Sequence, residues 1–201
     1  MTIYLLYVIF GPSVNRQTGF LLPCGAVKGG ATTAEGAVLC AQTDVDVTVA
    51  QARAWFLSLR DHPERYRFAT HDGVTFVEGD FGQAGACFQT RERFYGFKWT
   101  LHFQVEEVTE TAFRFRLLRP SWAGVWGAFV LNELGAASIS LRLEVGAATR
   151  LGRWLLRLPP VAVAVRRQIA SEVAHIKASM EALYGREGRG GEGMGREGGE
   201  E

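Results

Sequence analysis

The chain has 201 residues, of which 47% are hydrophobic and 21% charged, and its formal net charge is +1. This length fits one globular domain with extensions, and the composition is sufficient for a sizeable core. A net charge so close to zero gives no support for a nucleic-acid partner. Nothing in the sequence indicates an obligate protein partner. Three cysteines without a Cys-x-x-Cys pair indicate neither a disulfide framework nor a zinc site. No apolar run reaches the roughly 18–20 residues of a membrane span. The odd number and wide spacing of the cysteines suit a reducing compartment, so we expect a cytoplasmic protein. We expect no cofactor.

The two ends of the chain differ from its middle. Residues 1–36 are apolar and then rich in Gly and Thr, which indicates an N-terminal extension. Residues 185–201 are dominated by Gly, Glu and Arg and contain almost no core-forming side chains. Such a composition predicts a disordered tail. Its acidic residues outnumber its arginines, which argues against RNA binding. The folded domain is therefore expected over residues 37–184.

The domain begins with one strand and two short helices. Residues 38–47 predict a strand, because valines alternate with aspartates toward its end. Thr48 is a suitable cap for a helix over residues 49–59. Residues 61–66 predict a second short helix, with Asp61 as its cap and Glu64 at the capping-box position.

Six further strands are expected between residues 74 and 145, and short turns rich in Gly, Pro and Ser separate them. Short connections are typical of antiparallel neighbours. The sheet would therefore contain seven strands. The six predicted ranges are 74–79, 86–95, 98–108, 112–119, 124–134 and 137–145.

Two helices are expected to end the domain. Residues 148–158 form a short amphipathic segment, which Pro159 interrupts. The helix over residues 160–184 carries an apolar stripe at steps of three and four, and Gly185 suits its end. A long helix lying across one curved antiparallel sheet is the arrangement that covers all these strands.

Several segments carry a resemblance to a known family, together with the order and spacing of these elements. They are Asp44–Val47 leading into Ala54–Phe56, His62–Tyr66, Gly85–Phe88, and the last-helix run Arg166–Lys177 with Glu181. They resemble the helix-grip fold of the START-related superfamily (SRPBCC), which includes polyketide cyclases/dehydrases and the birch-pollen-allergen type, over about residues 37–184. The resemblance implies an α+β fold with a cavity between the sheet and the last helix, in which members bind hydrophobic small molecules and a minority catalyse reactions.

Alternation along the strands predicts which side chains line the concave face of the sheet. One alternative is a solid core, since protein interiors are normally close-packed. The other is a cavity, which the resemblance favours. The residues predicted to bind a ligand there are Phe88, Glu92, Trp99, Leu101, Phe103, Phe113, Phe115, Phe129, Leu141, Val165, Ile169, Val173 and Met180.

Glu92 is the one titratable group that this pattern places inside. It alternates with Phe88 and Thr90, whereas Arg91 and Arg93 belong to the opposite, solvated set. An unpaired carboxylate on an apolar face is costly, so burial favours the neutral form of Glu92 unless a partner such as a bent arginine or a ligand amine stabilises its charge. The neutral carboxyl could orient a ligand hydroxyl, or act as a general acid if a reaction is catalysed. The alternative is a bulge or a shifted register that turns Glu92 outward.

The sequence gives no catalytic constellation and no metal-ligand spacing among its histidines, which are His62, His71, His102 and His175. His62 is expected at a helix-capping corner and His102 on a solvent face. Three functions remain open: a carrier or sensor of a hydrophobic small molecule or lipid, a cyclase, dehydratase or hydrolase acting in the same pocket, and a structural partner with a filled core. Several inward titratable groups would favour the enzyme. Because only one is found, we favour the carrier.

The segment over residues 148–158 has a second possible role. Leu151, Trp154, Leu155 and Leu158 share one face, and three arginines share the other. The arginines with Trp154 suit transient contact with an anionic membrane. The alternative is that the apolar face packs over the pocket mouth and the arginines are solvated. The residues predicted for membrane contact are Arg150, Arg153, Trp154 and Arg157.

Overall fold

The computed structural model describes residues 38–94, 97–119 and 121–185. The predicted extension over residues 1–36 and the tail after Gly185 lie outside this part of the chain. The described elements are, in order, β1 (Leu39–Val45), α2 (Val49–Ser58), η1 (Pro63–Tyr66), β2 (His71–Glu78), β3 (Cys87–Phe94), β4 (Phe97–Val108), β5 (Ala112–Arg119), η2 (Ser121–Ala123), β6 (Val125–Gly135), β7 (Ser138–Ala147), α3 (Arg150–Arg157) and α4 (Pro159–Tyr184).

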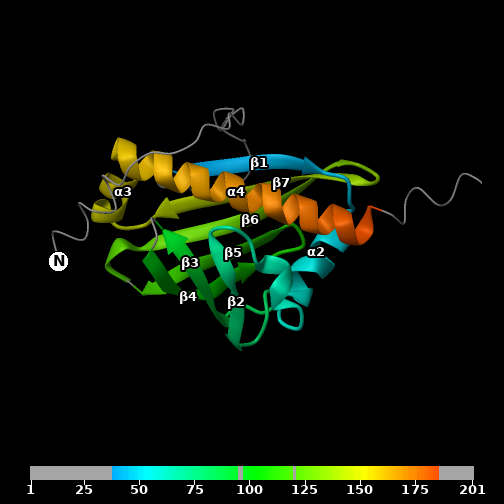
Figure 1. The fold of residues 1–201 in the computed structure, drawn as a ribbon, viewed down its shortest axis with the longest axis horizontal. Coiled ribbons are helices and arrows are strands. Elements are labelled where there is room, and N and C mark those ends of the chain that lie inside the picture. Colours follow the sequence, from blue (N-terminus) through cyan, green and yellow to red (C-terminus); the bar gives the residue numbers. More distant parts are fainter. Residues whose placement is uncertain (1–37, 95–96, 120, 186–201) are drawn as a thin grey trace, which may run out of the picture.

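The seven strands form one antiparallel sheet with the order β1-β7-β6-β5-β4-β3-β2. Consecutive strands from β2 to β7 are neighbours, as their short connections predict. Strand β1 joins the far edge by pairing with β7. The sheet curves around the long helix α4, which crosses its concave face (Figure 1). This is the α+β helix-grip fold that the sequence predicts.

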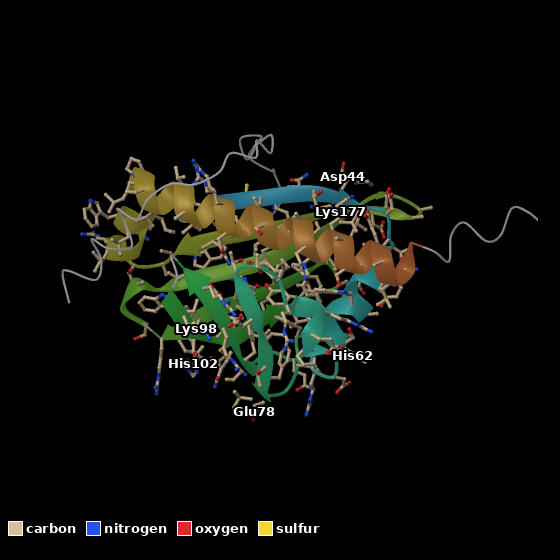
Figure 2. All side chains as sticks on the ribbon, viewed as in Figure 1. Asp44, His62, Glu78, Lys98, His102 and Lys177 are labelled. Atoms are coloured by element: carbon tan, nitrogen blue, oxygen red, sulfur yellow. The ribbon has the colours of Figure 1, made fainter. Side chains whose placement is uncertain are left out.

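Helix α4 spans 26 residues and starts at two prolines, whose fixed φ suits a first helical turn. Its buried stripe includes Ile169, Val173 and Ile176. Near its C-terminal end it is fastened to β1, because Lys177 donates a hydrogen bond to the backbone oxygen of Asp44. Figure 2 shows these two labelled residues side by side. The helix is therefore held against the β1 edge of the sheet.

Helix α2 fills one end of the concave face with aromatic side chains. Thr48 caps it through a capping box with Gln51. Phe56 is fully buried, and its ring lies 5.0 Å from that of Phe113 and 4.8 Å from that of Phe129, measured between centroids. Aromatic pairs at these separations attract beyond their area burial. This end of the sheet is consequently solid core.

Two local predictions differ from the structure. The second short helix is a 3-10 turn that begins at Pro63, and neither Asp61 nor His62 forms a side-chain cap on it. His62 instead contacts Glu64 at 3.2 Å, in an exposed corner. Strand β2 begins at His71, three residues earlier than predicted.

No helix of the described residues is long and apolar enough to span a bilayer.

Candidate functional site

A cavity of about 170 Å³ lies between the concave face of the sheet and the N-terminal half of α4. Its walls come from all the strands except β1, from α4 and η1, and from the loop between β2 and β3, which supplies Phe81. Most of the lining side chains are aliphatic or aromatic, and the polar ones gather around His71. The lining residues are Tyr66, His71, Val74, Phe81, Phe88, Thr90, Glu92, Leu101, Phe103, Phe115, Leu117, Val125, Trp126, Gly127, Phe129, Leu143, Val145, Val165, Gln168, Ile169 and Glu172.

Eight of the thirteen side chains predicted to bind a ligand lie in the wall of this cavity. All of them follow from strand alternation or from the apolar stripe of α4. Glu92 points inward, with only 7% of its surface exposed, whereas Arg91 and Arg93 are exposed. The eight are Phe88, Glu92, Leu101, Phe103, Phe115, Phe129, Val165 and Ile169.

The other five predicted residues do not line the cavity. Phe113 faces inward but packs on Phe56, which occupies that end of the concave face. Trp99 is 40% exposed, because it lies nearer to the β3–β4 turn than Leu101 does. The remaining three, Leu141, Val173 and Met180, are buried in solid core where the C-terminal half of α4 packs directly on the sheet.

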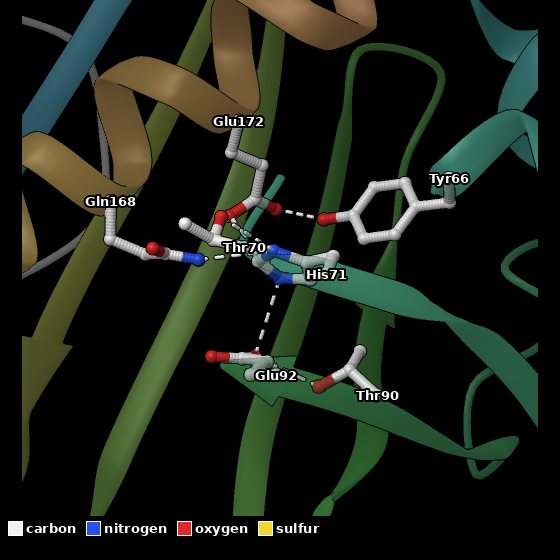
Figure 3. A network of polar contacts seen from close by, with 7 residues as sticks. All are labelled: Tyr66, Thr70, His71, Thr90, Glu92, Gln168 and Glu172. Carbon is white, nitrogen blue, oxygen red and sulfur yellow. Dashed lines mark hydrogen bonds and ion pairs between the residues drawn. The ribbon is translucent and has the colours of Figure 1, made fainter. Parts of the chain in front are cut away.

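A polar cluster occupies one end of the cavity, and His71 is at its centre (Figure 3). The Nε2 atom of His71 lies 3.3 Å from Oε1 of Glu92 and 4.0 Å from Oε2 of Glu172. Its Nδ1 atom lies 3.0 Å from the side-chain nitrogen of Gln168. The imidazole therefore lies between two carboxyl groups, one from β3 and one from α4.

Hydroxyl groups hold the two carboxyl groups in place. The Tyr66 hydroxyl donates a hydrogen bond to Oε1 of Glu172. The Thr90 hydroxyl donates to Oε1 of Glu92 at 2.9 Å. Hydrogen bonds of this kind fix the orientation of a carboxyl group and partly offset its loss of hydration. The cluster is thus preorganised by residues from η1, β2, β3 and α4.

The protonation of Glu172 is altered by its surroundings. Its side chain is buried under α4, with 8% of the residue exposed. Burial raises the pKa of the Glu172 carboxyl from 4.5 to about 8, because the charged form loses its hydration. At neutral pH this group is therefore mainly a neutral acid, able to donate a hydrogen bond or a proton.

A β-bulge brings His71 to the inner face. His71 pairs with Glu92 and Gly73 pairs with Arg91, so Asp72 is an additional residue in β2. Gly73 has a φ of 138°, which side-chain-bearing residues rarely adopt. Asp72 faces out and forms an ion pair with Arg93 at 2.7 Å.

The number of inward titratable groups corrects the expectation from sequence. We expected Glu92 alone, whereas His71 and Glu172 also line the cavity. Strict alternation from Val74 would turn His71 outward. The inward direction of His71 could therefore not be predicted without knowledge of the bulge. The sequence does contain a signal for Glu172: it lies four residues after Gln168, which places the two side chains next to each other beside the apolar stripe of α4.

The remaining histidines lie outside the cavity wall. His62 and His102 are labelled in Figure 2, and both lie away from α4. His102 follows Leu101, whose side chain lines the cavity, so His102 lies on the opposite face of β4. The ring of His175 stacks on Phe68. Within the described residues, no group of three or more His, Cys, Asp or Glu side chains is arranged to hold a metal ion.

Helix α3 presents a different face to the protein than predicted. Leu151 and Trp154 are 50% and 56% exposed, so this face does not pack over the pocket. Gly152 and Leu156 are buried instead. The reason is the close approach of Gly152 to the backbone of Ala123, where a β-carbon would lie only 2.0 Å from the carbonyl oxygen.

No protein-family model matches the chain, and no curated protein does. Solved structures share its fold. The structure of KanY has a TM-score of 0.57 at 15% identity, covering 73% of this chain and 98% of that one. A norcoclaurine synthase from Thalictrum flavum, in complex with dopamine and hydroxybenzaldehyde, has a TM-score of 0.54 at 12% identity, covering 82% and 98%.

A START superfamily protein from Mycobacterium smegmatis is similar to the chain over 74% of its length and 97% of that protein, with a TM-score of 0.52 at 11% identity. At such identities the likeness establishes the fold alone. The chain thus has the helix-grip fold of the START-related superfamily, as its sequence resemblance predicts.

Proposed function

We propose that this protein binds a hydrophobic small molecule or lipid in the cavity between the sheet and α4, as a carrier or sensor. The observation that carries the proposal is the cavity itself, with apolar walls and one polar end. Covering apolar ligand surface there is worth about 25 cal/mol per Å² before the costs of association. The polar cluster would then orient the ligand, as a few convergent polar groups do in small-molecule sites.

Native mass spectrometry of freshly purified protein tests this proposal. We expect a copurified ligand, seen as an additional mass that denaturation releases. Phe103 stacks on Phe88 in the cavity wall, at 5.1 Å between ring centroids. Phe103→Glu should therefore lose the ligand while circular dichroism shows a folded protein. Val77→Glu is the matched control, because Val77 is 65% exposed on β2. Folded wild-type protein that neither retains nor takes up any apolar ligand would contradict the proposal.

An enzyme acting in the same pocket, of the cyclase, dehydratase or hydrolase type, is the second candidate. The observation that favours it is the cluster of His71, Glu92 and Glu172, which removes the argument for a carrier that rested on a single inward titratable group. Groups of differing acidity in a cavity are suited to proton transfer. In such a reaction Glu172 would serve as a proton donor and His71 as a proton acceptor.

The fate of the copurified ligand separates the two candidates. If the protein is a carrier, the mass of the ligand stays unchanged when the isolated ligand is incubated with ligand-free protein. An enzyme converts it, and His71→Asn would slow the conversion at least about 100-fold, the range typical of a lost acid–base group. Glu110→Gln, an exposed change in the β4–β5 turn, should leave the rate unchanged.

We also propose that α3 and the start of α4 touch an anionic membrane during ligand exchange. Leu151, Trp154 and Val163 are exposed apolar side chains in this region. Five arginines and no acidic residue lie between Glu144 and Glu172. An exposed aromatic residue among arginines suits the interface of a bilayer containing anionic lipids. The arginines are Arg150, Arg153, Arg157, Arg166 and Arg167.

Co-sedimentation with vesicles tests the membrane contact. We expect binding to vesicles containing phosphatidylserine and little binding to pure phosphatidylcholine. Changing Arg150, Arg153 and Arg157 to Ala should weaken the affinity for these vesicles on the order of 100-fold, since each basic residue near such a surface contributes about 1 kcal/mol. The matched control changes the exposed Arg60, Arg91 and Arg119 to Ala. Equal loss in both triple variants, or no binding by the wild type, would contradict the proposal.

A further inference from the structure

We propose that the polar end of the cavity binds a basic nitrogen, so that the ligand is a compact apolar molecule carrying one ammonium group. This inference rests on the ligand-binding function proposed above and names the chemical class of the ligand. It follows from the charges, the free acceptor atoms and the aromatic residues of the cavity wall.

The charges of the lining residues do not balance. Two carboxyl groups, Glu92 and Glu172, face a single imidazole, and no Lys or Arg is among the lining residues that the structure describes. A protonated His71 can neutralise one carboxylate. Ionising the second inside a low-dielectric cavity requires one more positive charge. A ligand ammonium group supplies that charge, whereas a ligand anion would add a repulsive one.

Acceptor atoms remain available beside the imidazole. Oε1 of Glu92 accepts a hydrogen bond from the Thr90 hydroxyl and lies 3.3 Å from Nε2 of His71. Its other oxygen, Oε2, accepts no hydrogen bond from any described residue. Oε2 of Glu172 lies 4.0 Å from Nε2 of His71, which is too far for a hydrogen bond. Glu92 and Glu172 are both more than nine-tenths buried in the cavity wall. Figure 3 shows them on opposite sides of the imidazole. An ammonium group has three N–H donors, and the carboxyl oxygens of Glu92 and Glu172 can accept hydrogen bonds from them.

Aromatic rings also form part of the cavity wall. Tyr66 lies at the polar end, where its ring centroid is 5.4 Å from that of His71 and its hydroxyl contacts Glu172. The aromatic residues that line the cavity as a whole are Tyr66, Phe81, Phe88, Phe103, Phe115, Trp126 and Phe129. The faces of such rings attract cations within about 6 Å, and the attraction is larger when the cation is desolvated. Carboxylates together with aromatic rings therefore favour a cationic head group over a neutral one, while the rest of the wall favours an apolar body.

Binding of an ammonium group should be coupled to the ionisation of Glu172. The groups that face Glu172 are Tyr66 from η1, His71 from β2 and Glu92 from β3, and Gln168 lies one turn away on α4. None of these carries a permanent positive charge. In the free protein burial keeps the Glu172 carboxyl protonated, with its pKa near 8. An entering ammonium group stabilises the carboxylate, so a proton is released at neutral pH.

Three probes of matched size test the inference: 2-phenylethylamine, 2-phenylethanol and 3-phenylpropanoate. They carry a cationic, a neutral and an anionic group on the same apolar body. We expect isothermal titration calorimetry at pH 7 to show the amine binding at least about 10-fold more tightly than the alcohol, and the carboxylate most weakly. In buffers of different ionisation enthalpy, amine binding should release up to one proton.

Variants assign this preference to the cluster. Glu172→Gln should bring the amine within about threefold of the alcohol and abolish proton release. Glu110→Gln removes one exposed acidic residue and should change neither result. If Glu172→Gln does not fold, Glu92→Gln provides the same affinity comparison. Equal affinity for amine and alcohol in the wild type would overturn this inference and leave the ligand-binding function standing. Binding of none of the three probes would count against both.

Discussion

Glu172 joins the long helix to the polar end of the cavity, and its burial has a consequence for stability. The folded protein holds the pKa of Glu172 near 8, whereas the unfolded chain has a value of about 4.5. The folded state therefore binds more protons between these values, so the free energy of unfolding falls as pH rises from about 4.5 to 8. Below pH 4.5 the contribution is complete.

Urea unfolding between pH 4.5 and 8 tests this prediction. Relative to Glu172→Gln, the wild type should lose a few kcal/mol of stability across the interval. Glu181→Gln is the control on the same helix. Burial alone would raise the pKa of the Glu181 carboxyl, but hydrogen bonds from Lys177 and from the backbone of Asp46 outweigh this and lower it. Replacing Glu181 should therefore leave the slope between pH 4.5 and 8 in place. If the pH dependence of stability persists in Glu172→Gln, a group other than Glu172 causes it.

At the scale of single residues, the sequence predicts the inward direction of Glu92 but not its partner. Alternation is sufficient for Glu92, because β3 is regular between Phe88 and Glu92. It fails for His71, because one additional residue in β2 reverses the alternation before Gly73. The contact between the two side chains depends on the pairing of β2 with β3, which no local pattern contains.

At the scale of elements, α4 divides into two parts. Val165, Ile169 and Glu172 line the cavity, whereas Val173, Ile176 and Met180 are buried in solid core. The same periodic stripe runs through both parts, so sequence periodicity predicts the inner face of the helix but not the change from cavity to core. That change depends on α2, whose Phe56 fills the space at one end only.

Strand β6 controls the size of the cavity through a glycine. A β-carbon at Gly127 would lie 2.5 Å from the ring of Phe115, which lines the cavity. In Gly127→Ala the ring must therefore move, and the free space beside it is the cavity. We expect the retained ligand to bind about 10-fold more weakly, in line with the typical cost of overpacking.

Calorimetry or displacement of the ligand measures this effect. Gly135→Ala is the control at the other end of β6, where a new β-carbon would lie 3.3 Å from the Ser138 hydroxyl and outside the cavity wall. Unchanged affinity in a folded Gly127→Ala variant would show that Phe115 does not limit the space available to the ligand.

For the whole molecule, ligand binding and folding are linked. A ligand that binds only the folded state stabilises it by about 2.7 kcal/mol at 100 times its Kd. For a domain of this size that corresponds to a rise in Tm of about 5–10 °C. We expect differential scanning fluorimetry to show this rise for the copurified ligand. Phe103→Glu should show almost none, and Val77→Glu should behave as the wild type. A ligand that binds without raising Tm would indicate that it also binds unfolded chains.

Most of the architecture was predictable because its determinants are local, whereas the pairing of β1 with β7 joins segments about 100 residues apart. Alternation predicts the strands, short turns make them antiparallel neighbours, and periodicity with prolines and a glycine bounds the last helix. The resemblance then orders these elements. Of the two alternatives for α3, packing of its apolar face over the pocket is wrong, because the close contact between Gly152 and Ala123 overrides the larger hydrophobicity of Leu151 and Trp154.

The additional residue in β2 also affects how related sequences should be compared. A protein with the same fold and a regular second strand would have one residue fewer between the positions of Thr70 and Val74. An alignment without a gap there would match its inward side chain to Asp72, and the cavity histidine would then be judged missing. Placing a one-residue gap opposite Asp72 restores the match to His71. Searches for proteins that share the polar cluster should therefore first allow an insertion at Asp72, and only then compare the residue at the position of His71.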